Sequence, residues 1–162
     1  MFRNSAAFGV RDAQFSIDIG FYVFKLPFVT FVIDWLFVAV AFVTLLVLAT
    51  HVLSGGIVLQ PPRPKVRRAT KAHLAVLLAV MALLKAADYW VTRYELTNAN
   101  RGSFTGPNYT VVNAQLPAVL LLALIAVLAA VLFLSTLKTD RWRPAAVASA
   151  LWAVVALVGG VI

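Results

Sequence analysis

The chain has 162 residues, of which 62% are apolar and 12% are charged, whereas soluble domains carry about 45–50% and about 25%. A water-soluble fold of this size cannot bury so much apolar surface, so composition excludes that class and indicates an all-α integral membrane protein. The absence of cysteine excludes disulfides and thiolate chemistry. Two histidines are too few for a zinc site without carboxylate help, so we expect no metal and no cofactor.

The first expected element is a short amphipathic segment within residues 1–26, which we place outside the cytoplasm. Polar and apolar residues separate onto two faces when residues 11–25 are drawn as a helix, which favours a helix lying in the membrane interface. The alternation from Phe15 to Phe21 also fits a short strand. We favour the interfacial helix and keep the strand as the alternative.

Four apolar stretches follow, at residues 27–53, 72–94, 116–137 and 144–162. Each is close to the roughly 20 residues that a helix needs to cross about 30 Å of hydrocarbon. We therefore predict a four-helix transmembrane domain over residues 27–162, built as two antiparallel hairpins. The last stretch is barely long enough and has no polar flank, so we expect the chain to be part of a longer protein.

Basic residues predict the orientation of these spans. They concentrate in loops 55–71 and 138–143, which by the positive-inside rule face the cytoplasm of a bacterial plasma membrane and leave both termini outside. Aromatic residues fit this frame, with an outer belt at Tyr89, Trp90 and Tyr94 and an inner one at Trp142.

The first basic loop is also expected to contact anionic lipid headgroups. Nucleic acid is not an expected partner despite the net charge of +8, because no stacking aromatics are interleaved with the basic residues. The expected lipid contacts are Arg63, Lys65, Arg67, Arg68 and Lys71.

Small residues at helical spacing predict where the last two spans pack, because such faces let helix backbones approach closely. One expected packing face is the pair Ala126 and Ala130. The other is a stripe formed by Ser149, Ala153, Ala156 and Gly160.

Asp34, Lys85 and Asp88 are charged residues inside the expected spans, roughly 9–14 Å from the outer boundary at 1.5 Å per residue. Facing lipid would cost each about 2.5–3.5 kcal/mol at mid-depth, so we expect an intramembrane polar network. Asp34 and Lys85 can meet across antiparallel spans, and Lys85 and Asp88 share a helix face. Two interpretations stay open: a clamp that pins two helices together, which we favour, and a proton, ion or substrate pathway.

No pattern in the sequence names a reaction. His51 and His73 lie near the cytoplasmic ends of the first two spans, where we interpret them as polar end residues rather than a metal or proton-sensing site. No nucleophile-elbow, Walker or zinc-protease motif is present. We expect no catalytic residue in this chain and favour a protein that is not an enzyme, and we keep as the weaker alternative an envelope lipid-handling enzyme whose active site lies in another part of the longer protein.

Four ordered motifs resemble a bacterial family of large multi-pass membrane proteins, the uncharacterised protein family UPF0182. They are residues 11–28 (RDAQFSIDIGFYVFKLPF), 51–60 (HVLSGGIVLQ), 85–96 (KAADYWVTRYEL) and 109–117 (YTVVNAQLP). Ala13 departs from the pattern, where many relatives carry proline. The resemblance implies the late transmembrane portion of such a protein, with further spans before it and a large extracytoplasmic domain after it, and it transfers no catalytic residue.

Two functions are therefore carried forward. The first is a membrane anchor or scaffold module for an extracytoplasmic domain or an envelope assembly, whose partners are the bilayer and the rest of the longer protein. The alternative is a transporter or channel component that uses Asp34, Lys85 and Asp88.

Overall fold

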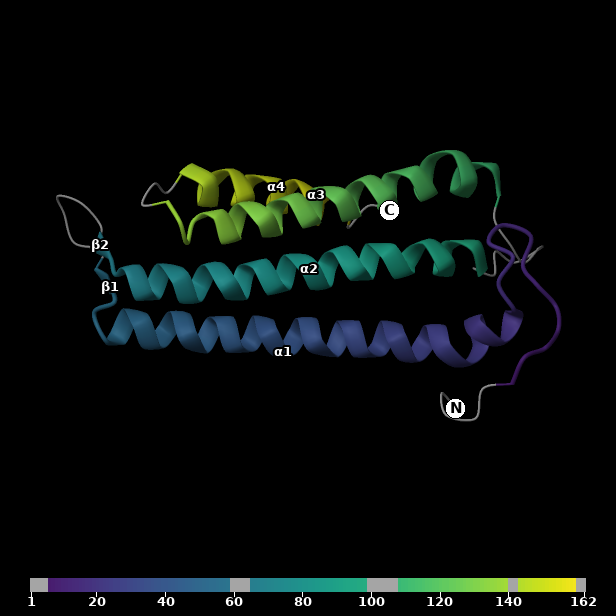
Figure 1. Ribbon diagram of the computed structural model, residues 1–162, viewed down its shortest axis with the longest axis horizontal. Helices are drawn as coiled ribbons and strands as arrows, with labels where there is room; N and C mark the ends of the chain where they lie inside the picture. The colour runs from purple at the N-terminus through teal and green to yellow at the C-terminus, as the bar shows by residue number, and fades with distance from the viewer. Residues whose placement is uncertain (1–5, 59–64, 99–107, 140–142, 160–162) are drawn as a thin grey trace.

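The computed structural model describes residues 6–58, 65–98, 108–139 and 143–159. Its α-helices lie along one long axis (Figure 1). They are α1 (Leu26–Leu53), α2 (Arg68–Asn98), α3 (Leu116–Ser135) and α4 (Arg143–Gly159). Two π-helices, η2 (Phe21–Lys25) and η3 (Val111–Gln115), lead into α1 and α3, and the two-residue strands β1 (Ile57–Val58) and β2 (Lys65–Val66) pair antiparallel between α1 and α2.

The helices stack in the order α1, α2, α3, with α4 against α3 (Figure 1). Successive helices run antiparallel. The end of the bundle that holds η2 and η3 is called the π-helical end below, and the end that holds β1 and β2 the hairpin end. Helix α4 also reaches α1, because Phe37 and Trp152 stack with ring centroids 6.5 Å apart.

Three helical segments are long and apolar enough to cross a membrane: Phe21–Leu53, Arg68–Asn98 and Val111–Ser135. This confirms the helical class and three of the expected spans by length and composition. The fourth apolar helix, Pro144–Val158, is shorter, so the four-span arrangement stays a prediction.

Both π-helices have the same local cause, a proline at the start of the α-helix that follows. Pro27 and Pro117 each occupy the second position of their helix and have no N–H to donate to the preceding turn. The residue before each proline instead donates five residues back, Leu26 to the Phe21 carbonyl and Leu116 to the Val111 carbonyl. One wide turn thus accommodates the missing donor.

Small side chains form most of the core between α2, α3 and α4. Ala126 and Ala130 are buried, which confirms the first expected packing face. The second is wrong: Ser149, Ala153 and Ala156 are exposed, and Gly160 lies outside the described residues. Helix α4 instead packs through Ala148, Trp152 and Val155, because this face buries more apolar surface than the small-residue stripe would.

The segment before η2 differs from both expected forms. Residues 11–18 make a compact turn closed by a bridge between Arg11 and Asp18, and helix begins only at Ile19. The carboxylates cause this, because Asp12 accepts hydrogen bonds from the backbone N–H groups of Gln14 and Phe15 and so competes with helix formation. The interfacial helix is therefore wrong for these residues, and the alternative strand does not form either.

Candidate functional site

Lys85 and Asp88 form an ion pair one turn apart on α2. The Lys85 Nζ lies 2.6 Å from the Asp88 Oδ2, and their side chains are 34% and 22% exposed. The ammonium also lies 4.9 Å from the ring centroid of Tyr89. Tyr89 is buried, which corrects its expected place in an outer aromatic belt, and its hydroxyl donates to the Val155 carbonyl at 3.0 Å. The pair therefore neutralises itself within one helix, beside the contact that ties α2 to α4.

Asp34 is separated from this pair. It is exposed on α1 and makes no ion pair with Lys85. The register explains why: the Thr30 hydroxyl donates to Glu95 on α2 at 2.7 Å. Asp34, four residues further along α1, is therefore level with about Val91 on the antiparallel helix, and Lys85 lies a further six residues, about 9 Å, away.

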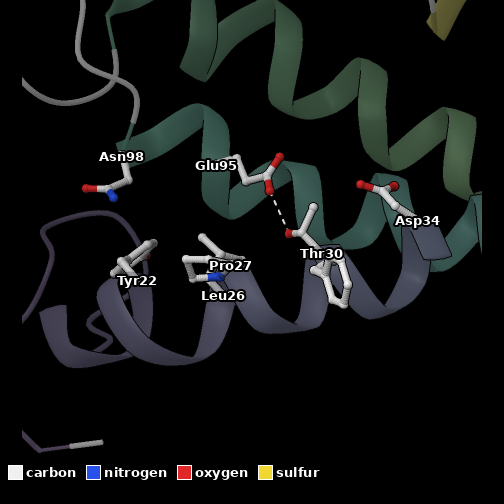
Figure 2. Close-up of a pocket in the computed structure, with 8 residues that line it drawn as sticks. Tyr22, Leu26, Pro27, Thr30, Asp34, Glu95 and Asn98 are labelled. Atoms are coloured by element: carbon white, nitrogen blue, oxygen red, sulfur yellow. Dashed lines mark hydrogen bonds between the residues drawn. The ribbon is translucent and has the colours of Figure 1, made fainter. Parts of the chain in front are cut away.

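Instead, Asp34 lines an open cleft of about 510 Å³ at the π-helical end, between α1 and the last turns of α2 (Figure 2). Figure 2 shows Asp34 one turn beyond Thr30, with Glu95 across the cleft on α2. Helix α2 continues to Asn98, beyond the expected end of the second span at residue 94, and Glu95 therefore lies on the helix. Two carboxylates and a hydroxyl make the cleft suited to a cation or a proton.

A cluster of aromatic rings around Arg93 covers the end of α2, and no sequence motif predicted it. The guanidinium carbon lies 3.7 Å from the ring centroid of Trp90, 4.4 Å from that of Tyr94 and 5.4 Å from that of Phe15. Arg93 donates to the Tyr94 hydroxyl, whereas its buried Nε has no hydrogen-bond partner in the described part of the chain. Phe15 and Phe21 also pack edge-on against Tyr94, so the cluster fastens the N-terminal segment to α2.

Carboxylates order the rest of that segment. The Tyr22 hydroxyl donates to Asp12 at 2.5 Å. Burial of the Asp12 carboxyl opposes its ionisation, but this bond and three backbone bonds outweigh burial and lower its pKa. Backbone N–H groups of Phe8, Gly20 and Gly9 lower the pKa of Asp18 in the same way, against a smaller effect of burial.

At the hairpin end, α1 stops at a glycine turn. Gly55 has a φ of 68°, and Gly56 donates to the His51 carbonyl at 2.8 Å, the pattern that closes helices with a left-handed residue. The His51 Nδ1 lies 3.1 Å from the Thr70 hydroxyl, and the His51 and His73 rings meet edge-on with centroids 5.7 Å apart. The two histidines are thus neighbours, but no group of three potential metal ligands occurs among the residues described.

The expected lipid-contact residues have different surroundings. Arg67 and Arg68 are exposed, while the Lys71 ammonium donates to the Thr139 carbonyl at 3.0 Å and so links the first turn of α2 to the segment after α3. Arg63 and Trp142 lie outside the described residues. For Lys65 the structure describes the backbone, which lies in β2. Lipid contact stays a prediction that rests mainly on Arg67 and Arg68.

Three long apolar helices indicate a helical protein of the membrane class by their length and composition. The model of the uncharacterised protein family UPF0182 matches residues 1–162, and the chain belongs to this family.

Its relatives are longer proteins. A UPF0182 protein of Kineococcus radiotolerans is 43% identical over 162 residues, which cover 98% of this chain and 16% of the relative. UPF0182 proteins of Rhodococcus jostii and Mycobacterium tuberculosis are each 45% identical, over 99% of this chain and 17% of theirs. The chain therefore spans about a sixth of the length of these relatives. No solved structure matches it significantly.

Proposed function

We propose that this chain is a membrane scaffold module that holds the other parts of a longer envelope protein in place. The observation that carries the proposal is the Lys85–Asp88 ion pair, whose charges neutralise each other within α2 at 2.6 Å. A charge that moves ions or protons must exchange partners, whereas a paired charge beside an interhelical hydrogen bond suits a fixed joint. The partners of such a module are the bilayer, further transmembrane helices and an extracytoplasmic domain.

The remaining polar contacts support the same function. Tyr89 binds the backbone of α4, Thr30 binds Glu95 between α1 and α2, and Lys71 links α2 to the segment after α3 at the hairpin end. Each contact joins two parts of the chain. Their common effect is to fix how the helices lie against one another.

The test compares Lys85→Met, Asp88→Leu and the double variant, expressed in the host cell. A single substitution leaves one partly buried charge without its partner, so the protein should be less stable and its membrane abundance should fall. The loss of stability should be smaller than the about 3–5 kcal/mol that breaking a fully buried pair costs. The double variant should recover abundance and support normal growth and envelope permeability. Normal abundance with lost function in the double variant would contradict the scaffold.

A second function, a transporter or channel component, is favoured by the cleft at Asp34. An ionised carboxylate on a membrane helix costs about 2.5–3.5 kcal/mol if it faces lipid at mid-depth. Asp34 is exposed and has no ion-pair partner among the described residues, so it requires water or polar groups in its surroundings. The cleft with Glu95 provides such a place.

Asp34→Asn separates the two functions, because it removes the charge with little change of shape. A conducting role predicts normal abundance and a loss of cation or proton flux into proteoliposomes. A scaffold role predicts that abundance, growth and flux all stay unchanged. Lys85→Met with Asp88→Leu is the matched control, since that pair lies outside the cleft.

A further inference from the structure

An apolar groove lies between α2 and α3, on the face of α2 opposite Lys85 and Asp88. Its volume is about 520 Å³. Ala86 and Ala123 are buried and form its floor, while Leu83, Leu124 and Trp90 are exposed and form its walls. The groove exists because alanines face each other where the two helices meet, with larger side chains on either side.

The length of the groove decides what kind of molecule fits it. On α2 it runs from Leu83 to Trp90, seven residues or about 10 Å along the helix axis. One leaflet of a bilayer provides about 15 Å of hydrocarbon, half of about 30 Å. The groove is therefore shorter than one leaflet and can hold part of one acyl chain along its length.

Charge at the end of the groove identifies the rest of the ligand. Trp90 lines the groove, and the guanidinium carbon of Arg93 lies 3.7 Å from the centroid of its ring. Arg93 has no ion-pair partner in the part of the chain described. A guanidinium matches the geometry of a phosphate. An apolar groove that ends at a tryptophan stacked with an arginine complements a phospholipid, because the acyl chain matches the groove and the phosphate matches the positive charge beside it.

We propose that this groove binds one phospholipid of the leaflet at the π-helical end, with an acyl chain along Ala87 and Ala123 and the phosphate at Arg93. The basic loops predict that this is the outer leaflet. The site is separate from the headgroup contacts expected at Arg67 and Arg68, which lie at the hairpin end. It does not depend on whether the chain acts as a scaffold or in transport.

Native mass spectrometry of the full chain in detergent, titrated with phosphatidylglycerol, tests the proposal. Ala123→Phe should fill the groove and abolish the bound-lipid peak. Ala87→Leu is a smaller change that should weaken the peak, and it provides the test if Ala123→Phe impairs folding. Ala150→Phe, at an exposed alanine of α4, is the matched control and should bind as wild type does. Arg93→Gln should weaken binding about tenfold, the effect of losing one charged hydrogen bond.

Two further arms distinguish the lipid from other occupants. Free glycerol phosphate at a concentration equal to that of the lipid should not displace the lipid. If it does displace the lipid, the site at Arg93 binds phosphate alone and the proposal of a lipid site is wrong. A photoreactive residue in place of Leu124 should yield lipid adducts in cells. Protein adducts at that position, or unchanged lipid binding in both Ala123→Phe and Ala87→Leu, would overturn the proposal.

Discussion

Helices α1 and α3 are both apolar enough to cross a membrane, but they use their side chains in opposite ways. None of the most apolar window of α1 is buried, whereas 39% of that of α3 is. Helix α1 turns large residues such as Phe42 and Leu45 outward, and α3 turns Ala126 and Ala129 inward. Apolarity alone suits a helix to lipid, while small residues at helical spacing make a helix pack against its neighbours.

Helix α1 contacts α2 along its length, and three of these contacts depend on polar atoms or on a glycine. Thr30 bonds to Glu95, the Thr44 hydroxyl lies 3.7 Å from the Met81 sulfur, and the glycine turn at its end packs against Thr70. These contacts are polar or steric and local. The contrast with α3 predicts which substitutions each helix tolerates.

The largest effect is expected from Ala129→Leu in α3. Ala129 is 0% exposed, and extra methylenes in a packed core cost about 1–3 kcal/mol. The same substitution at Ala49, an exposed alanine of α1, should change the free energy of unfolding little. Denaturant titration in mixed micelles measures both variants, and an equal cost at the two positions would remove the distinction between the helices.

Gly56→Ala tests the joint at the hairpin end and should cost about 1–2 kcal/mol, within the usual range for overpacking. A β-carbon there would lie 2.7 Å from the Thr70 hydroxyl oxygen and 3.0 Å from the His51 Nδ1. Adding Thr70→Ala removes the closest atom, so the double variant should be more stable than the sum of the two single effects predicts. Simple additivity in the same unfolding measurement would mean that the glycine has no steric role.

Thr30→Val tests the joint at the π-helical end and should cost about 1 kcal/mol, the worth of one hydrogen bond. The Thr30 hydroxyl binds Glu95 on another helix. Thr50→Val is the matched control, because the Thr50 hydroxyl donates to the Leu46 carbonyl of its own helix and is exposed. If both threonines contribute equally, the bond between α1 and α2 adds nothing beyond a helix-internal one.

The sequence predicts the helices well because their length and apolarity are properties of single segments. The pairing of residues across helices is harder to predict from the sequence. The second span is predicted to end at Tyr94, whereas α2 ends at Asn98. This difference shifts the register of the helix against α1 by four residues, about one turn. That shift wrongly places Asp34 near Lys85. The position of Glu95 and the packing face of α4 likewise depend on neighbours that a single segment does not reveal.

The N-terminal turn shows the same limit, because side-chain bonds to the backbone compete with a helical pattern that is present in the sequence. Asp18 accepts bonds from the N–H groups of Phe8, Gly9 and Gly20. These bonds favour the ionised carboxylate, and the three N–H groups come together around it in the folded turn. The hydrophobic pattern of residues 11–25 contains no information on them.

The smallest effect on the bundle should come from acid, which acts on this turn alone. The pKa values of Asp12 and Asp18 lie below the ordinary 3.8 in the folded chain. Their stabilising contribution is therefore complete above about pH 3.8 and is lost as the pH falls through the lower folded values. The amide resonances of Phe8 and Gly20 should shift in that range, and the shift should vanish in Asp18→Asn. The amide resonances of α3 should stay unchanged, because the turn lies outside the packed helices. If α3 unfolded over the same pH range, the turn would contribute to the stability of the whole bundle rather than only to the order of the N-terminal segment.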